Sequence, residues 1–445
     1  MFRHAASSSS RMLIMQTSMR SIEYLVPSLC GQTYLYGSNA DASVSSRIVT
    51  ALTMHIDPAV LGMALSEAVV RFPQMAVSLV EKDGRRTFIS LNAPVPVFEA
   101  SQDMPSDISD SRLGGYMFRV SYCHKHLYVD YHRSLADEIG MMAFVKALVL
   151  RYLELSGYPV QTDGSVKLMS GEYFSGEGDD PMDKMQDAYS SRPIWYMDAK
   201  AVVPPKVESD QEEVVQVKVP VAKLKKDYLD LASIPVTYVA PLLSHALHEV
   251  YADEINAGEY IVASVQINLR PYYPSASLRP YYTPVFLAYN RNLNDYPYKT
   301  VLMSQKKLLE AQLKNDTIAY SAQRKIAGIE KAFNSADTLA GIDAEFTVLQ
   351  ENSDRRATYD ICRIGNVILP ESMQRLVCEF YPVIPTSGKS VSVTVTTYKG
   401  DMCVTVSGRK HAYEVCRRLV ELMHANDIDA YIADRYTFGP LVMKK

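Results

Sequence analysis

The chain reads Tyr131-His132-Arg133-Ser134-Leu135-Ala136-Asp137-Glu138 between a stretch typical of a strand and a stretch typical of a helix. Residues 126–131 alternate between two faces, which predicts the strand. Residues 140–155 carry apolar side chains at helical spacing, which predicts the helix. Within the junction, His132 can accept a proton near neutral pH, whereas Arg133 stays protonated in proteins. The octapeptide therefore sets a permanent cation directly beside a possible proton acceptor.

The residues before the octapeptide predict a small unit of strands and helices. Residues 45–56 are typical of a strand, and Asp57 and Pro58 then open a helix as its N-cap and its first helical residue. Two hairpins follow, over residues 74–91 and 118–131. With the helix after the octapeptide, these elements make up the first half of the chain.

The residues after the octapeptide predict a crossover and a second unit of the same style. Residues 157–213 are rich in Gly, Pro, Asp and Ser, which indicates a long connection rather than core. Beyond it we expect strands over 213–219 and 260–268, helices over 235–252 (capped by Thr237), 300–326 and 411–426, and a hairpin over 391–407. The predicted fold is α/β, an α+β sandwich of two similar sub-domains, residues 22–200 and 210–445, with a shared cleft.

Composition narrows the classes of partner. The chain has 445 residues, 47% of them hydrophobic, and a formal net charge of -4, so it lacks the basic field of a nucleic-acid binder. No apolar run reaches about 18 residues, so we expect no membrane span. The six cysteines are scattered without CxxC spacing, which favours reduced thiols and a cytoplasmic location. His245 and His248 share a helical face, but a zinc site needs further ligands and none is evident, so no metal is expected.

The first residues are treated separately. Residues 1–21 contain no acidic residue, while Arg3, Arg11 and Arg20 are interleaved with a run of serines. This composition is compatible with a mitochondrial presequence. The alternatives are a disordered leader or a start codon placed too early, and we take residues 1–21 as a disordered leader.

Four segments, the first of which contains the octapeptide, carry a resemblance to a known family. Residues 126–148, HLYVDYHRSLADEIGMMAFVKAL, resemble the HHxxxDG region of the chloramphenicol acetyltransferase-like superfamily, which includes condensation domains of peptide synthetases and bacterial alcohol acetyltransferases. Residues 268–270, Asn-Leu-Arg, are similar to the family's NLR strand, and residues 364–370 to its NVGRIxLP stretch. The hairpin around residues 399–401 also fits. The resemblance spans roughly residues 40–435 in the family's order, which makes it more specific than any one piece.

The resemblance implies two acetyltransferase-like sub-domains with a cleft or tunnel between them, and an acyl-transfer reaction. A histidine in the cleft would take a proton from an alcohol or amine that attacks a thioester carbonyl. In this alignment the catalytic histidine falls on Arg133, the first histidine of the motif on His132, and the glycine after the Asp on Glu138. The motif is degenerate, and the candidate catalytic residues are His132, Arg133 and Asp137.

The alignment leaves alternatives open for the octapeptide and the second half. A bulge at the strand end would let His132 replace the missing base, although neighbouring strand residues otherwise point to opposite faces. Arg133 would bind an anionic group, or be neutralised by Asp130, Asp137 or Glu138. The resemblance makes Asp137 a structural carboxylate, with Arg133 or Arg270 as its partner. From the second half, Asn268 and Arg270 are the candidate substrate-binding residues, and Tyr272, Tyr273, Tyr281 and Tyr282 are candidates to line a tunnel.

Two functions follow. The first is an acyltransferase that moves an acyl group, such as acetyl, from coenzyme A or a carrier-protein thioester to an alcohol or amine, weakened by Arg133. The second is a catalytically inactive relative that binds an acyl ligand or a protein. In either case acyl-coenzyme A or an acyl carrier is the expected co-substrate, with no permanently bound cofactor. A carrier protein is a candidate partner; nucleic acid is not.

Overall fold

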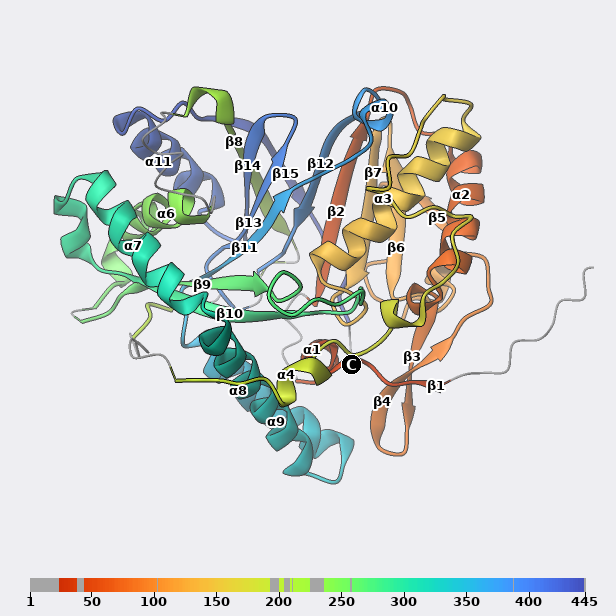
Figure 1. Cartoon of the computed structure of the whole chain (residues 1–445), viewed down its shortest axis with the longest axis horizontal. Coiled ribbons are helices and arrows are strands. Elements are labelled where there is room, and N and C mark those ends of the chain that lie inside the picture. The colour runs from red at the N-terminus through yellow and green to blue at the C-terminus, as the bar shows by residue number, and fades with distance from the viewer. Residues whose placement is uncertain are drawn as a thin grey trace, which may run out of the picture.

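The computed structural model describes residues 24–37, 44–101, 103–192, 200–203, 209, 211–224, 236–256, 258–386 and 388–443. The predicted leader, residues 1–21, lies outside this part. The described chain forms two lobes side by side, each with a sheet covered by helices (Figure 1). The predicted α/β class with two halves is confirmed.

The first lobe is a five-stranded sheet with two long helices packed on it (Figure 1). Its strand order is β12 (Val377–Val383), β2 (Ser45–Leu52), β7 (His126–His132), β6 (Phe118–Cys123) and β5 (Val97–Glu99). The helices are α2 (Pro58–Arg71) and α3 (Glu138–Leu155), and a small sheet beside them has the order β1 (Tyr24–Leu25), β4 (Arg85–Ser90), β3 (Val77–Lys82). Short α1 (Leu29–Leu35) precedes β2.

The second lobe is a seven-stranded sheet. Its order is β10 (Tyr282–Tyr289), β9 (Ile261–Asn268), β11 (Tyr359–Asn366), β13 (Ser392–Tyr398), β14 (Asp401–Gly408), β8 (Glu212–Pro220) and β15 (Tyr431–Phe438). Its long helices are α6 (Val236–Val250), α7 (Tyr298–Gln312), α8 (Asn315–Asn334), α9 (Leu339–Asp354) and α11 (Ala412–Ala425). Short helices are α4 (Asp183–Gln186) and α10 (Glu371–Gln374), and single 3-10 turns cover Pro73–Met75, Ser111–Leu113, Ser175–Glu177, Val221–Lys223, Ala252–Glu254 and Arg291–Asp295.

Most local predictions are confirmed. The Asp57 carboxylate caps α2 by accepting hydrogen bonds from the backbone N–H groups of Ala59 and Val60, and Pro58 is the first helical residue. One prediction is wrong, because Thr237 lies inside α6 rather than capping it. The helical range expected over residues 300–326 is confirmed, and it is divided between α7, which ends at Gln312, and α8, which begins at Asn315.

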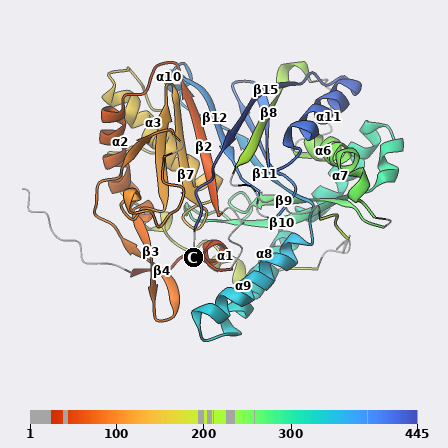
Figure 2. The ribbon, with the colours of Figure 1, turned by 180° about the vertical axis from the view of Figure 1, so that it is seen from behind.

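One strand crosses between the lobes. β12 comes from the C-terminal segment, yet it pairs antiparallel with β2 and completes the first sheet, with Phe380 opposite Thr50. Figure 2 shows β12 and β15 where the lobes meet. Val49, Tyr381 and Phe438 belong to one small buried cluster there. Residues 377–383 of the C-terminal segment thus belong to the sheet of the first lobe.

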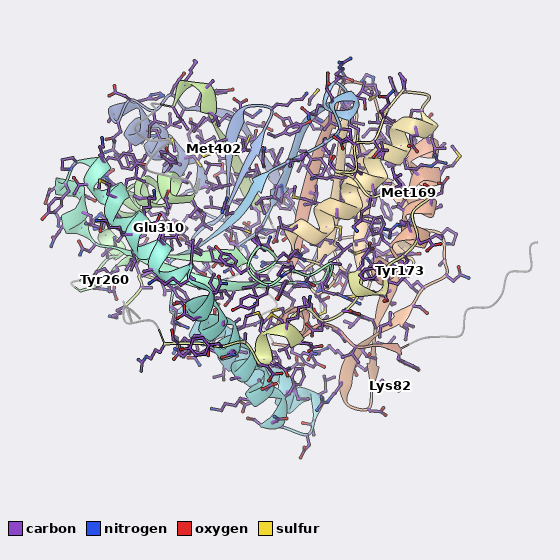
Figure 3. The ribbon with its side chains drawn as sticks, in the orientation of Figure 1. Lys82, Met169, Tyr173, Tyr260, Glu310 and Met402 are labelled. Atoms are coloured by element: carbon purple, nitrogen blue, oxygen red, sulfur yellow. The ribbon has the colours of Figure 1, made fainter. Side chains whose placement is uncertain are left out.

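Each lobe has its own apolar core, and side chains fill the space between helices and sheets (Figure 3). Phe118 and Phe144 lie in the first core, and Leu243 and Val404 in the second. In the described part of the chain, no helix combines the length and the apolar character needed to cross a membrane.

Candidate active site and ligand cavity

The octapeptide forms the turn between β7 and α3, as expected. β7 ends at His132, and α3 begins at Glu138 with Asp137 as its N-cap. The Asp137 carboxylate accepts a hydrogen bond from the backbone N–H of Gly140, at 2.8 Å. This cap fixes where α3 begins, and with it the directions of the side chains on either side.

The His132 imidazole is sealed inside the protein. Its exposed fraction is 0%, and it lines neither of the two cavities found at this site. Its Nδ1 accepts a hydrogen bond from the backbone N–H of Ser134 at 3.2 Å and lies 2.6 Å from the Ser134 hydroxyl. Burial, helped by the charge of Arg133, lowers the pKa of His132 to about 3. The ring is therefore neutral, and because Nδ1 is an acceptor, its proton sits on Nε2.

This arrangement argues against the predicted role of His132 as general base. A base must offer an unprotonated nitrogen to the substrate, within hydrogen-bond reach. The Nε2 atom of His132 carries the proton, is buried, and has no hydrogen-bond partner among the described residues. No bulge turns the ring toward the cavity, since β7 keeps a regular register with β2 up to the pair His132–Ser45.

Arg133 points the other way, into a large cavity. Its guanidinium stacks over Tyr34, with 4.5 Å from Cζ to the ring centroid, and its Nε lies 3.8 Å from Oε1 of Glu138. Burial disfavours the cation, but Tyr34 and Glu138 outweigh this effect, and the pKa of Arg133 lies above its usual value. Of the three expected counter-charges, Glu138 is the one in contact, because Asp130 pairs with Arg47 and Arg119.

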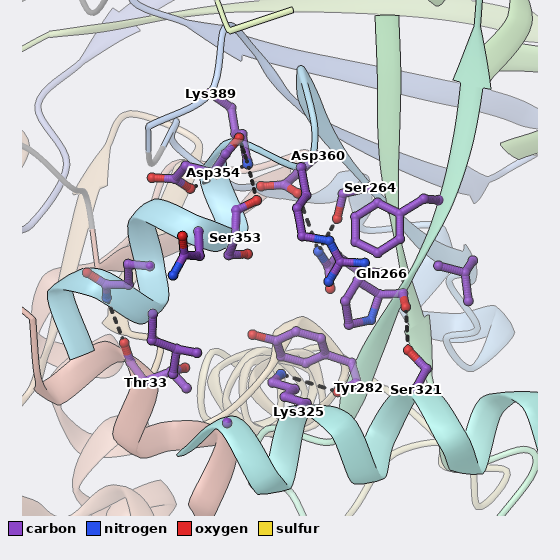
Figure 4. Close-up of a pocket in the computed structure, with 18 of the residues that line it drawn as sticks. Thr33, Ser264, Gln266, Tyr282, Ser321, Lys325, Ser353, Asp354, Asp360 and Lys389 are labelled. Carbon is purple, nitrogen blue, oxygen red and sulfur yellow. Dashed lines mark hydrogen bonds and ion pairs between the residues drawn. The ribbon is translucent and has the colours of Figure 1, made fainter. Parts of the chain in front are cut away.

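The cavity lies between the lobes and has a volume of about 630 Å³. The first lobe lines it with Thr33, Tyr34, Val44 and Arg133, and the second with residues of β9, β10, β11, β13 and of helices α7, α8 and α9. Figure 4 shows Tyr282 and Lys325 on one side of the open space and Asp360 on the opposite side. Of the four candidate tunnel tyrosines, Tyr282 lines this cavity, and its hydroxyl is hydrogen-bonded to that of Tyr34.

Cations outnumber carboxylates on the walls of this cavity. The cationic residues are Arg133, Arg324, Lys325, Arg356 and Lys389, and the carboxylates are Asp354 and Asp360. Lys389 pairs with Asp354 at 3.4 Å, so part of this charge is neutralised within the wall. The net charge of the cavity walls is therefore positive, which favours a ligand that carries anionic groups.

A second, smaller pocket adjoins the large cavity at Arg133. Its volume is about 20 Å³, which is room for one water molecule. Arg133, Gln266, Tyr282 and Cys362 line both spaces, which adjoin there. The residues that line the small pocket and not the large cavity are Asp137, Glu138, Ile139, Asn268 and Arg363. Burial raises the pKa of the Cys362 thiol well above its usual value, so this thiol stays protonated and is no acyl-accepting nucleophile.

Asp137, Arg270 and Asn268 form a structural cluster. Arg270 Nη1 lies 2.7 Å from Asp137 Oδ2, and the guanidinium also donates to the backbone carbonyls of Ser277 and Arg279. Asn268 Oδ1 accepts from the backbone N–H and from Nη1 of Arg270. Arg270 lines neither cavity, and its guanidinium pairs with Asp137. Asn268 reaches only the small pocket.

Glu138 is the site residue that the sequence analysis did not select. Its side chain is buried, and its Oε1 accepts a hydrogen bond from the Ser46 hydroxyl at 3.2 Å. Burial raises the pKa of Glu138; Arg133 opposes that shift and Asp137 adds to it. The available signal was a carboxylate where the resembling family has glycine. Tyr34 and Lys325 had no such signal, because they come from segments far away in the chain.

No metal site forms from the histidines considered earlier. His245 Nε2 lies 3.2 Å from Glu249 on the next helical turn. Across the described ranges, no group of three or more His, Cys, Asp or Glu side chains could hold a metal ion.

Comparisons with known proteins agree on the fold. No protein-family model matches the sequence, and no curated protein matches it either. Among solved structures, polyketide synthase associated protein 5 from Mycobacterium tuberculosis is similar with a TM-score of 0.58 and 12% identity, over 92% of this chain and 98% of that one. TRI101 of F. sporotrichioides, complexed with coenzyme A and T-2, has a TM-score of 0.55 and 12% identity, over 93% of this chain and 100% of that one.

A third similar structure comes from a peptide synthetase. The epimerization domain from the third module of tyrocidine synthetase B has a TM-score of 0.53 and 10% identity, over 92% of this chain and 97% of that one. At these identities the likeness shows the fold and not the chemistry. The structural match covers nearly the whole of this chain and of each similar structure, so the two-lobed architecture is shared along the full length.

Proposed function

We propose that this chain, which has the fold of the chloramphenicol acetyltransferase-like superfamily, binds an acyl group carried as a thioester in the cavity between its lobes. The donor would be acyl-coenzyme A or an acylated carrier protein. The observation that carries this proposal is the placement of Arg133, whose guanidinium lies in the cavity wall while His132 is sealed off from it. The group that meets the acyl carbonyl is therefore a permanent cation rather than an imidazole.

The cavity supports this class of ligand in two ways. Its volume, about 630 Å³, lies in the range of small-molecule sites and accommodates an acyl chain with part of a pantetheine arm. Its walls carry more cations than carboxylates, which suits the phosphates of coenzyme A or of a carrier arm. We also propose a cytoplasmic location, because all six cysteines are free thiols.

Acyl transfer to an alcohol or amine with His132 as general base is the less favoured proposal. It would require the ring to leave its hydrogen bond with Ser134 and to turn its unprotonated nitrogen into the cavity. With a pKa lowered to about 3, the ring is also a weak base. In this proposal Asp137 acts by holding the turn, not by exchanging protons.

The test is a calorimetric titration with octanoyl-coenzyme A. We expect binding by the wild type and a loss of affinity of at least tenfold in Arg133→Ala. The matched control is Arg151→Ala, which removes an arginine of α3 that pairs with Glu67 of α2 away from the cavity. This variant should bind octanoyl-coenzyme A as the wild type does. Absence of binding to folded wild type, or equal affinity in Arg133→Ala, would contradict the proposal. A second titration with octanoyl-pantetheine distinguishes the two candidate donors. Tighter binding of octanoyl-coenzyme A than of octanoyl-pantetheine would favour acyl-coenzyme A as the donor over an acylated carrier protein.

A further inference from the structure

Two neighbouring carboxylates at the start of α3 have opposite surroundings. Asp137 is fully engaged, since Oδ1 accepts from the Gly140 N–H, and Oδ2 accepts from Arg270 and from the backbone N–H of Tyr281. Within the described chain, Ser46 is the one side chain that donates a hydrogen bond to Glu138. Asp137 and Glu138 both line the small pocket. Because the hydrogen bonds of Asp137 are taken up by Gly140, Arg270 and Tyr281, Glu138 is the carboxylate placed to exchange a proton with a molecule bound there.

The surroundings of Glu138 also suit a base. A carboxylate in an apolar, enclosed place holds a proton more strongly than one in water, and a pair of carboxylates in contrasting environments is a common way to divide acid–base roles. Burial raises the pKa of Glu138, and Arg133 keeps part of the ionised form available. The carboxylate is therefore a better proton acceptor than an exposed glutamate.

The size of the small pocket restricts what can react there. The free space beside Glu138, about 20 Å³, suits one water molecule. This space adjoins the large cavity at Arg133, Gln266, Tyr282 and Cys362, which line both. An acyl carbonyl that reaches Arg133 from the large cavity would thus meet the arginine and, beside it, a single water molecule.

We propose that Glu138 activates a water molecule in the small pocket, and that the protein hydrolyses the thioester bound in the large cavity. The inference rests on the proposed function, which places the thioester carbonyl at Arg133. The water oxygen bonds to the carbonyl carbon while Glu138 takes one of the water protons, and the negative oxygen that forms lies beside the Arg133 guanidinium. The carbon–sulfur bond then breaks, and the thiolate takes the proton from Glu138. The products are a carboxylic acid and a free thiol, and nothing is oxidised or reduced.

The experiment follows thiol release from octanoyl-coenzyme A in water enriched in ¹⁸O, with no alcohol or amine added. For wild type we expect free thiol and one ¹⁸O atom in the octanoic acid, detected by mass spectrometry. Glu138→Gln should lower kcat by roughly 10²–10⁴-fold, the usual contribution of general-base catalysis, with the affinity for octanoyl-coenzyme A changed less than about threefold. The wild-type rate should rise with pH through the pKa of Glu138, and Glu138→Asp should keep this rise at a lower rate.

The matched control is Glu212→Gln. Glu212 is also fully buried, has a pKa raised by burial, and binds one hydroxyl, Thr386, and one arginine, Arg409, but it lines neither cavity. Its replacement should leave kcat unchanged. Octanoyl-coenzyme A that binds without thiol release, or a kcat equal in Glu138→Gln and wild type, overturns the hydrolysis while the proposed binding stands. Failure of octanoyl-coenzyme A to bind at all overturns the proposed function and the hydrolysis together.

Discussion

Arg270 Nη1 lies 2.7 Å from Oδ2 of Asp137, and this ion pair joins the end of β9 in the second lobe to the start of α3 in the first. The same carboxylate caps α3 and accepts the backbone N–H of Tyr281. One side chain thus holds the turn of the octapeptide and the approach of the two lobes. The role that the family resemblance implied for Asp137, a loop-holding carboxylate with an arginine partner, agrees with this geometry.

Removal of the charge from Asp137 should weaken both connections. We expect Asp137→Asn to lower the free energy of unfolding by roughly 3–5 kcal/mol, because it leaves the Arg270 cation without its counter-charge in a buried place. Urea denaturation measures this change. Glu67→Gln breaks a solvent-accessible ion pair between α2 and α3 and should have almost no effect. Equal stability of the two variants would show that the pair does not hold the lobes together.

Gly140 should be irreplaceable, although it lies in a helix. A β-carbon at this position would lie 2.0 Å from the backbone carbonyl oxygen of Leu278, so α3 approaches the second lobe more closely than any other residue allows. Gly140→Ala should therefore destabilise the protein by several kcal/mol, against the usual helix preference for alanine. Gly62→Ala in α2 meets no atom within 4 Å and should stabilise it by about 0.5–1 kcal/mol. Thermal unfolding of the two variants, with shifts in opposite directions, checks the prediction.

His132 should make the fold sensitive to acid. Its pKa is lowered to about 3 in the folded state, while the unfolded chain has the ordinary value of about 6.5. Between these values the unfolded state binds the extra proton, so stability falls as pH drops below about 6.5, by up to about 1.4 kcal/mol per pH unit, and is unaffected above it.

The variant His132→Asn isolates this effect. Asparagine offers an oxygen to the Ser134 N–H in place of Nδ1 and does not titrate. The unfolding free energy of wild type should fall by roughly 2–3 kcal/mol more than that of the variant between pH 7 and pH 4.5. Parallel pH profiles would mean that His132 is protonated in the folded protein, which would also reopen its role as a base.

Lys146 should destabilise the fold at neutral pH. It is largely buried on α3, and burial lowers its pKa to about 8. Because the unfolded chain holds this proton up to about pH 10.5, stability rises as pH increases from about 8 to 10.5. Lys146→Met keeps the shape of the side chain without the charge and should raise the free energy of unfolding at pH 7 by about 1–3 kcal/mol. Lys331→Met, at an exposed position of α8, is the control and should change the free energy of unfolding little.

The pattern of the chain was sufficient to predict the elements near the octapeptide and the class of the fold. The hairpin of β6 and β7, the cap at Asp57 and the long helix after the octapeptide follow from contacts between residues close in sequence, so their periodicity shows in the sequence itself. β12 could not be assigned to the first sheet in this way, because its partner β2 lies more than 300 positions earlier and nothing local marks the pairing.

The residues of the candidate site also fall into those that the sequence identifies and those that only the tertiary structure reveals. The sequence by itself determined that a histidine, an arginine and two carboxylates meet at one turn, and that the family's base position holds a cation that cannot accept a proton. Only the tertiary structure decided that His132 is buried away from the cavity, that Arg270 pairs with Asp137, and that Glu138 lines a water-sized pocket together with Arg133. The reason is physical, since burial and the direction of a side chain depend on what the second lobe packs against it, and those neighbours come from elsewhere in the chain.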